Sequence, residues 1–237
     1  MLIKKWEKLP PELQIDEVRP YWEYLRKKNF SLFWKRVFDI FVSGIVLLLI
    51  SPLFLILAIA IKIDSKGPVF YRQERVTQYC KRFRIFKFRS MVTDADKKGT
   101  LVTIDNDSRI TKVGKFIRKC KMDEMCQLID IFRGTMTFVG TRPEVPKYVS
   151  QYKAEYQSTL LLPAGVSSTA SIMFKDENDM LDKAEDVDDV YVNQILPIKM
   201  KWNLLDIKRF GFWRDIKICF MTVFAVLGKK YKEEDVS

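Results

Sequence analysis

An uncharged run of 22 residues at positions 40–61 constrains this chain more than any other feature; it reads IFVSGIVLLLISPLFLILAIAI. As a continuous helix at about 1.5 Å per residue it would reach about 33 Å, enough to cross a hydrocarbon core of about 30 Å. Such a helix is apolar on every side, which argues against the core helix of a soluble protein. The run therefore predicts insertion into a membrane.

Ser51 and Pro52 lie in the middle of this run. Proline removes one backbone hydrogen bond and clashes with the preceding turn, so a kink is predicted there, with the Ser51 hydroxyl as a candidate partner for the freed carbonyl. Basic residues crowd both flanks, at 1–39 and 62–89, and basic flanks prefer the cytoplasmic side. A re-entrant helix that breaks at Ser51-Pro52 and returns would keep both flanks on that side. A kinked helix that crosses remains the alternative.

The rest of the chain divides into three parts around this run. Residues 1–39 mix aromatic and basic side chains that suit the headgroup layer. Residues 62–170 are expected to form a cytosolic catalytic domain. Residues 171–237 form a C-terminal extension with an acidic stretch at 176–189 and a helix within 202–227, which lies either in the interface or on the core. The expected fold class is α+β, mostly helical, with a small β-hairpin and interfacial amphipathic helices.

The chain contains no histidine. This excludes Ser-His-Asp and Cys-His nucleophile systems, histidine general bases and histidine-ligated metals. Nucleophilic or acid–base chemistry must therefore use a carboxylate, thiol, hydroxyl or lysine. The four cysteines include no C-x-x-C pair, and no cleavable signal is recognisable, so reduced thiols in a cytosolic setting are expected.

Two aromatic-rich stretches, 69–71 and 83–88, predict a β-hairpin that turns at residues 77–80. The second strand is basic, with Arg82, Arg84, Lys87 and Arg89. Basic residues among aromatics can bind nucleic acid, but no RNA-recognition motif is matched, and a membrane-anchored chain already has anionic headgroups as a partner. We expect no nucleic acid, whereas an anionic substrate such as a nucleoside diphosphate stays open.

A carboxylate pair, Asp123-Glu124, is expected in the first turn of a helix at about 122–132, after a helix capped at 107–109 that runs through residue 117. Acidic residues in a first turn commonly just stabilise the helix dipole. With the basic residues of 118–121 directly upstream, the same place could instead dock a phosphate group. The residues alone leave both readings open. Farther along, a compact turn at 139–144 carries one arginine, Arg142.

Several motifs follow one another along residues 31–170. They are Lys35-Arg36-x-Phe38-Asp39, Ser51-Pro52, Gly67-Pro68-Val69-Phe70, Gln73-x-Arg75, Lys87-Phe88-Arg89-Ser90-Met91, Asp107-x-Arg109-Ile110-Thr111, Arg118 with Asp123-Glu124, and Val139-Gly140-x-Arg142-Pro143. In this combination the chain resembles the bacterial monotopic phosphoglycosyl transferases, the "sugar transferase" family that starts glycan assembly on a polyprenyl carrier.

The resemblance implies transfer of a sugar-1-phosphate from a UDP-sugar to undecaprenyl phosphate with release of UMP, the first membrane step of surface polysaccharide or glycoconjugate assembly. It makes Asp123 the nucleophile of a covalent phosphosugar intermediate and Glu124 the Mg²⁺ ligand. Arg118 and Arg142 match phosphate-binding positions, and the other substrate-binding candidates are Lys87, Arg89, Arg109 and Gln127. The implied location is one leaflet of the bacterial inner membrane, at its cytoplasmic face. Membrane lipid and downstream glycosyltransferases are the expected partners, and a homodimer is left open.

This chemistry suits a chain without histidine. An aspartate with a pKa of about 3.9 is ionised at pH 7, and a polyprenyl phosphate is ionised too, so neither displacement needs a general base. Basic side chains are then needed to bring three anionic groups together. The rival hypothesis is a non-catalytic, polybasic membrane-anchored scaffold or adaptor. It explains the charge and the anchor, but not a carboxylate pair beside Arg118 and Arg142.

Three departures from the family pattern stand out. Residues 77–80 replace a turn that usually holds glycine, Thr141 replaces the first proline of Gly-Pro-Arg-Pro, and residues 163–168 replace a Pro-Gly-Ile-Thr-Gly segment. None touches the Asp123-Glu124 pair, so the expected chemistry stands. The last departure and the tail from Ile172 onward bear on which sugar is recognised.

Overall fold

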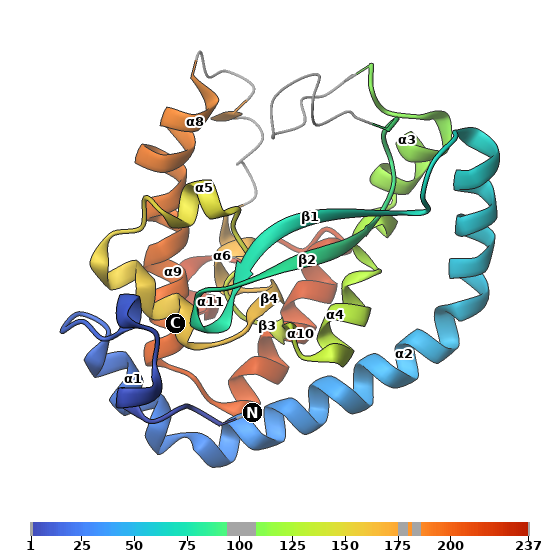
Figure 1. Cartoon of the computed structure of the whole chain (residues 1–237). Helices are drawn as coiled ribbons and strands as arrows, with labels where there is room; N and C mark the ends of the chain where they lie inside the picture. The colour runs from blue at the N-terminus through green and yellow to red at the C-terminus, as the bar shows by residue number, and fades with distance from the viewer. Residues whose placement is uncertain (1, 94–107, 175–179, 182–185, 237) are drawn as a thin grey trace.

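The computed structural model describes residues 2–93, 108–174, 180–181 and 186–236. Its longest element among these is α2, a 36-residue helix at Asn29–Asp64, which would reach about 54 Å if straight. Figure 1 shows that α2 runs beneath the body, bends, and then rises along one side of it. The most apolar window of α2 has a mean hydropathy of 3.0, and 11% of it is buried against the rest of the chain. This exposure separates α2 from the core helix of a soluble protein.

The helix continues through Pro52 without interruption, so the predicted break is a bend within one helix. The Ser51 hydroxyl donates a hydrogen bond to the carbonyl of Leu48 at 2.8 Å. Leu48 lies four residues before Pro52, and its carbonyl is therefore the one that loses its amide donor to the proline. The predicted partner for this carbonyl is confirmed, and it explains how the helical path is kept.

Both ends of α2 pack on the same body. Near its start, the Asp39 carboxylate, 1% exposed, accepts from the Thr137 hydroxyl at 2.7 Å. At its end, the Asp64 carboxylate accepts from the backbone N–H of Val113 at 2.9 Å. Between these contacts α2 exposes large apolar side chains, among them Phe41, Ile45, Leu48, Leu49, Leu55, Ile56 and Ile59.

The predicted hairpin is confirmed. β1 (Phe70–Thr77) pairs antiparallel with β2 (Lys81–Phe88), from Phe70 opposite Phe88 to Thr77 opposite Lys81, around the short helix η3 (Gln78–Cys80). Tyr79 and Cys80 have positive φ angles of 58° and 59°, a conformation in which glycine is strain-free. Packing compensates here, because Tyr79 is 7% exposed and belongs to the hydrophobic cluster of the N-terminal segment.

The segment with the carboxylate pair differs from the prediction. α3 spans Lys112–Lys119 and begins later than expected, because the Thr111 side chain caps it by accepting from Gly114 N at 3.0 Å; the expected cap residue Asp107 lies outside the described residues. The predicted helix at 122–132 is divided into a 3₁₀ turn, η5 (Met122–Glu124), and α4 (Gln127–Arg133). β3 (Met136–Val139) and β4 (Ala164–Ser167) form a parallel pair that the sequence analysis missed.

The N-terminal segment packs on the body. η1 (Trp6–Lys8), η2 (Pro11–Leu13) and α1 (Arg19–Lys27) contribute Leu13 and Leu25, both 0% exposed, to a hydrophobic cluster. That cluster also includes residues of η6 (Ala154–Leu161) and α9 (Leu196–Lys208). Aromatic side chains expected at the headgroup layer remain exposed at the start of α2, namely Phe30, Phe33 and Trp34.

Helices cover the remaining side of the body: α5 (Pro146–Val149), α6 (Thr169–Met173), α8 (Val187–Val190), the π-helix η7 (Tyr191–Ile195), α9, α10 (Phe212–Val226) and α11 (Glu233–Val236). The helix predicted within 202–227 is confirmed as α10, and the chain turns between it and α9, whose last residues also fall in that stretch. α9 is largely buried, whereas α10 buries Ile218 and Met221 and exposes a second apolar face. In the acidic stretch 176–189, only residues 180–181 and 186–189 are described.

Candidate active site

Asp123 and Glu124 are placed by a sharp turn between two helices. Lys121 adopts the left-handed conformation, with φ of 52° and ψ of 28°, and leads from the end of α3 into η5. η5 contacts both α3 and β2, so the two carboxylates sit beside the end of the hairpin. They therefore precede α4, and the prediction that they lie in the first turn of that helix is wrong.

Glu124 is clamped by two cations from other elements. Arg142, in the loop after β3, donates from both terminal nitrogens to the Glu124 carboxylate, with Nη1 to Oε2 at 3.1 Å. Lys87 of β2 donates to Glu124 Oε1 at 3.1 Å. Burial alone would raise the pKa of Glu124, but Arg142 and Lys87 together hold that pKa well below its ordinary value. Glu124 is therefore ionised, and it fixes Lys87 and Arg142 at the site.

Asp123 has a different environment from its neighbour. Burial raises the pKa of Asp123 above its ordinary value, and the negative charge of Glu124 raises it further, against the opposing charges of Lys87 and Arg118. Raising the pKa of a carboxylate increases its basicity, which makes it a better nucleophile when it is ionised. The pKa values of the two adjacent carboxylates are thus shifted in opposite directions, and strongly perturbed pKa values are typical of functional sites.

The structure brings together four of the predicted residues besides Asp123. Lys87, Glu124 and Arg142 are joined by hydrogen bonds, and the charge of Arg118 acts on Asp123. Burial lowers the pKa of Lys87 below its ordinary value, with Glu124 acting in the opposite direction. The site therefore gathers positively charged side chains around a carboxylate pair in a partly buried environment.

Gln127 lies at the start of α4, four residues after Asp123, and is 1% exposed. Neither its side-chain oxygen nor its nitrogen has a hydrogen-bond partner within the described part of the chain. A buried amide without partners costs free energy. This is consistent with its predicted place in a substrate site, where a ligand could supply the missing partners.

Arg89 lies apart from this group. It is 5% exposed, and its guanidinium donates to the Ser65 carbonyl at 2.6 Å, the Lys66 carbonyl at 3.1 Å and the Ile61 carbonyl at 3.2 Å. These contacts satisfy carbonyls at the C-terminal end of α2. Arg109 lies in the turn before α3, where its own carbonyl accepts from Val92 N at 2.9 Å.

Gln73 and Arg75, of the Gln73-x-Arg75 motif, were not among the predicted site residues. Arg75 donates to the Pro143 carbonyl at 3.0 Å and to the Gln73 side chain. It therefore ties β1 to the loop that carries Arg142. Its position two residues from Gln73 on one strand was a signal that both side chains lie on the same face of the hairpin.

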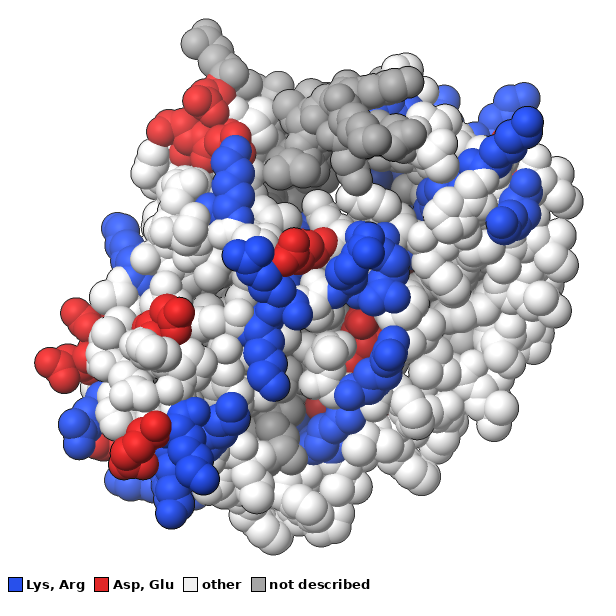
Figure 2. Space-filling model, in the orientation of Figure 1, with Lys and Arg blue, Asp and Glu red and all other residues white. Residues whose placement is uncertain are grey.

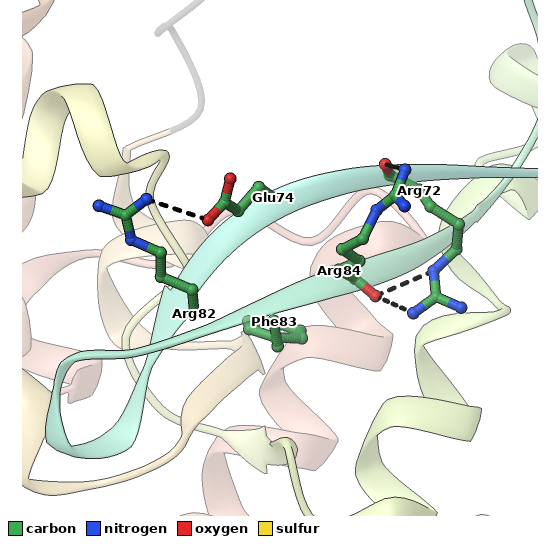
Figure 3. A pocket seen from close by; sticks show the side chains of 5 residues that line it. All are labelled: Arg72, Glu74, Arg82, Phe83 and Arg84. Carbon is green, nitrogen blue, oxygen red and sulfur yellow. Dashed lines mark hydrogen bonds and ion pairs between the residues drawn. The ribbon is translucent and has the colours of Figure 1, made fainter.

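A hollow lies on the outside of the hairpin, away from the carboxylate pair. Arg72, Arg82, Arg84, Glu74 and Phe83 line it (Figure 3), and Figure 2 shows Lys and Arg side chains gathered over this part of the molecule. Its arginines already have partners: Arg82 pairs with Glu74 at 3.3 Å, and Arg72 donates to the Arg84 carbonyl. This basic surface is the one that a polybasic adaptor would use.

The carboxylates of the site are the groups that could hold a metal ion. The described residues contain no group of three His, Cys, Asp or Glu side chains that could hold a metal by themselves. Mg²⁺ typically needs only one or two carboxylates, because it keeps several waters and binds substrate phosphates. Glu124, the metal ligand that the resemblance implies, could provide such a carboxylate, and its oxygens also accept hydrogen bonds from Lys87 and Arg142.

Comparison with known proteins gives a consistent answer. The family described as "Bacterial sugar transferase" matches residues 30–229. The chain is 36% identical over 200 residues to the UDP-glucose:undecaprenyl-phosphate glucose-1-phosphate transferase of Klebsiella pneumoniae, covering 83% of this chain and 40% of that protein. It is also 36% identical over 198 residues to the UDP-N-acetylgalactosamine-undecaprenyl-phosphate N-acetylgalactosaminephosphotransferase of Aeromonas hydrophila, covering 82% and 44%.

A shorter match covers 47% of this chain and 56% of an exopolysaccharide production protein, PSS, of Rhizobium leguminosarum, with 45% identity over 113 residues. The chain spans less than half the length of the two transferases above. The same identity to a glucose-1-phosphate and an N-acetylgalactosamine-phosphate transferase means that overall similarity does not select one sugar.

Proposed function

Because the chain belongs to the bacterial sugar transferase family, we propose that it transfers a sugar-1-phosphate from a UDP-sugar to undecaprenyl phosphate and releases UMP. The observation that carries this proposal is the pair Asp123-Glu124 with Lys87 and Arg142 bound to Glu124. A polybasic scaffold would need the basic surface but not two carboxylates whose pKa values are shifted in opposite directions.

In the first step, a carboxylate oxygen of Asp123 attacks the phosphorus that carries the sugar. The bond between this phosphorus and the bridging oxygen breaks, and UMP leaves with the electron pair. Lys87, Arg118 and Arg142 offset the negative charges that converge at this point. Asp123 then carries the sugar-1-phosphate as an acyl phosphate, and no proton has to be moved.

In the second step, a phosphate oxygen of undecaprenyl phosphate attacks the same phosphorus. The bond to Asp123 breaks, and the carboxylate is regenerated as the lipid-linked diphosphate sugar forms. Splitting the transfer into two displacements lets one carboxylate serve two anionic substrates in turn. Mg²⁺, held by Glu124 together with the donor phosphates, would neutralise charge on the diphosphate.

Glu124→Gln is expected to raise the Mg²⁺ concentration needed for half-maximal rate by roughly tenfold or more, because an amide is a weaker ligand than a carboxylate. The charge of Glu124 raises the pKa of Asp123, so its removal should also shift the acid limb of the pH–rate profile to lower pH. Mg²⁺ titrations at several pH values measure both effects. Glu74→Gln, in the exposed ion pair with Arg82, is the matched control; an unchanged Mg²⁺ titration in Glu124→Gln would remove this residue from the metal site.

The membrane arrangement we propose is re-entrant, at the cytoplasmic face. It is supported by the contacts of Asp39 and Asp64, at opposite ends of α2, with one charged body. A helix that crossed the bilayer would place these contacts on opposite sides. The exposed apolar face of α10, with Trp213, Phe220 and Phe224, would add to the contact with lipid.

Pro52→Ala is expected to favour a straighter, spanning α2, because it restores the amide donor that proline removes. Accessibility of Lys5→Cys and Lys66→Cys to an impermeant thiol reagent measures this, in a background where the exposed Cys120 is serine. With Pro52 present, both positions should react from the cytoplasmic side only. In Pro52→Ala, part of the Lys5→Cys population should become accessible from the other side. Continued exclusive cytoplasmic labelling of that variant would show that Pro52 does not set the topology.

The function is tested by incubating membranes that contain the protein with a panel of radiolabelled UDP-sugars and extracting the lipid. We expect label in a lipid-linked product with one or a few donors, dependent on added undecaprenyl phosphate. This panel also identifies the sugar. A polybasic adaptor would bind anionic vesicles but yield no labelled lipid with any donor.

A further inference from the structure

Glu144 is buried at the end of the loop that carries Arg142. Its side chain is 6% exposed. Its backbone carbonyl accepts from Val76 N at 2.9 Å, and the neighbouring Pro143 carbonyl accepts from Arg75 at 3.0 Å. The backbone directly after Arg142 is therefore fixed to β1, and the Glu144 carboxylate is fixed with it.

Two side chains from the C-terminal extension meet this carboxylate. The Tyr191 hydroxyl donates to Glu144 Oε1, and Lys199 Nζ lies 3.5 Å from the same oxygen. Lys199 Nζ also donates to the Tyr191 hydroxyl at 3.0 Å. Tyr191 is 5% exposed and Lys199 is 8% exposed. The three groups form a buried, hydrogen-bonded triad between the extension and the loop.

The charge of Glu144 matters because it lies two residues from Arg142. A buried carboxylate without a partner raises the free energy of the folded protein, so it favours pairing with any cation that can reach it. Arg75 is already at the limit of an ion pair, with Nη1 4.0 Å from Glu144 Oε2. Lys199 and Tyr191 satisfy the carboxylate, and Arg142 remains paired with Glu124.

We propose that Lys199 and Tyr191 are positioning residues for the transfer reaction, which hold Arg142 at Glu124 and the donor diphosphate by neutralising and fixing Glu144. This inference rests on the proposed function. It gives the extension beyond residue 171 an indirect part in catalysis. The extension holds the loop that carries Arg142 in place without contacting the substrate.

Lys199→Met is expected to lower kcat/KM for the UDP-sugar about 100-fold, the size of loss seen when a catalytic group is displaced by about 1 Å. Tyr191→Phe, which removes one hydroxyl, should lower it about tenfold and serves if Lys199→Met fails to fold. Lys201→Met, at an exposed position of the same helix α9, is the matched control and should match the parent chain. Thermal unfolding is recorded for each variant in the same detergent.

Two further comparisons separate positioning from general stability. Glu144→Gln combined with Lys199→Met removes both charges and should recover most of the lost activity, because no buried carboxylate then competes for Arg142. In an Arg142→Ala background, Lys199→Met should have little further effect, since its target is already absent. Because the double variant would also relieve a purely structural defect, the Arg142→Ala background decides: a purely structural residue would give an equal loss in both backgrounds.

Parent-like activity in both Lys199→Met and Tyr191→Phe would overturn the inference and leave the proposed function intact. So would a loss in Lys199→Met that is undiminished in the Arg142→Ala background. If the parent chain labels no lipid with any donor, the proposed function fails, and this inference fails with it.

Discussion

Asp123→Asn is expected to lower turnover about 10⁴-fold or more, the scale of loss when a covalent nucleophile is removed. An amide oxygen cannot form the acyl phosphate, although asparagine has nearly the same shape as aspartate. Because Asp123 lies in η5, and the hydrogen bonds that hold the two ends of α2 to the body involve Asp39 and Asp64, the variant should still accumulate in the membrane fraction. Transfer of labelled sugar to lipid and the amount of protein in the membrane are measured together.

Asp16→Asn is the matched control for this variant, since Asp16 is exposed and far from the site in the sequence. It should retain the activity of the parent chain. Robust transfer by Asp123→Asn would reduce Asp123 to a structural residue of its turn. Loss of both activity and membrane-bound protein would instead mean that the substitution disturbs folding. Asp123→Glu, which keeps the negative charge, would then be compared with the parent chain.

Arg142→Ala is expected to lower kcat/KM about 10²- to 10³-fold, the range for removing a preorganised donor that meets developing charge. It should also leave Glu124 with Lys87 as its remaining cation among the hydrogen bonds described above. Arg142→Lys should recover only part of the loss, because an ammonium cannot reproduce the two-pronged contact with a carboxylate or phosphate. Steady-state kinetics over a range of UDP-sugar concentrations measure the effect.

Arg82→Ala is the control for charge alone. Arg82 is exposed, with a side chain 68% accessible, and pairs with Glu74 on the outer face of the hairpin. The Arg82→Ala substitution removes one positive charge from the same strand that carries Lys87, yet it should leave kcat/KM near the parent value. Equal losses in Arg82→Ala and Arg142→Ala would indicate that net basicity, as in a polybasic adaptor, explains the binding of anions.

Features set by local chemistry were predictable from the sequence. The hairpin follows from aromatic-rich strands and a short turn, and it forms at residues 77–80 as expected. The link from Ser51 to Leu48 follows from the carbonyl that Pro52 leaves without a donor. The family motifs likewise predict Lys87, Glu124 and Arg142 at one site, and hydrogen bonds join the three residues.

Features set by long-range packing were not predictable. The parallel pairing of β3 with β4 joins two four-residue strands whose partners are separated by 28 positions, as in Met136 with Ala164, and such short runs carry little periodicity. Arg89 was predicted as a substrate ligand because it belongs to a basic stretch. Its guanidinium instead donates to the Ser65 carbonyl at the end of α2, a contact between distant parts of the sequence. The partners of Glu144 lie 47 and 55 positions away in the chain, so no local pattern could reveal them.

The most direct test of the account is the mass of the protein during the first half of the reaction. Detergent-solubilised protein is mixed with the UDP-sugar that gives lipid product, Mg²⁺ is added, undecaprenyl phosphate is omitted, and the reaction is quenched and digested. We predict a mass increase equal to one sugar-1-phosphate on the peptide that contains Asp123, with its absence in Asp123→Asn and its loss on addition of the lipid acceptor. An unmodified peptide from protein that goes on to make lipid-linked sugar would contradict the covalent mechanism.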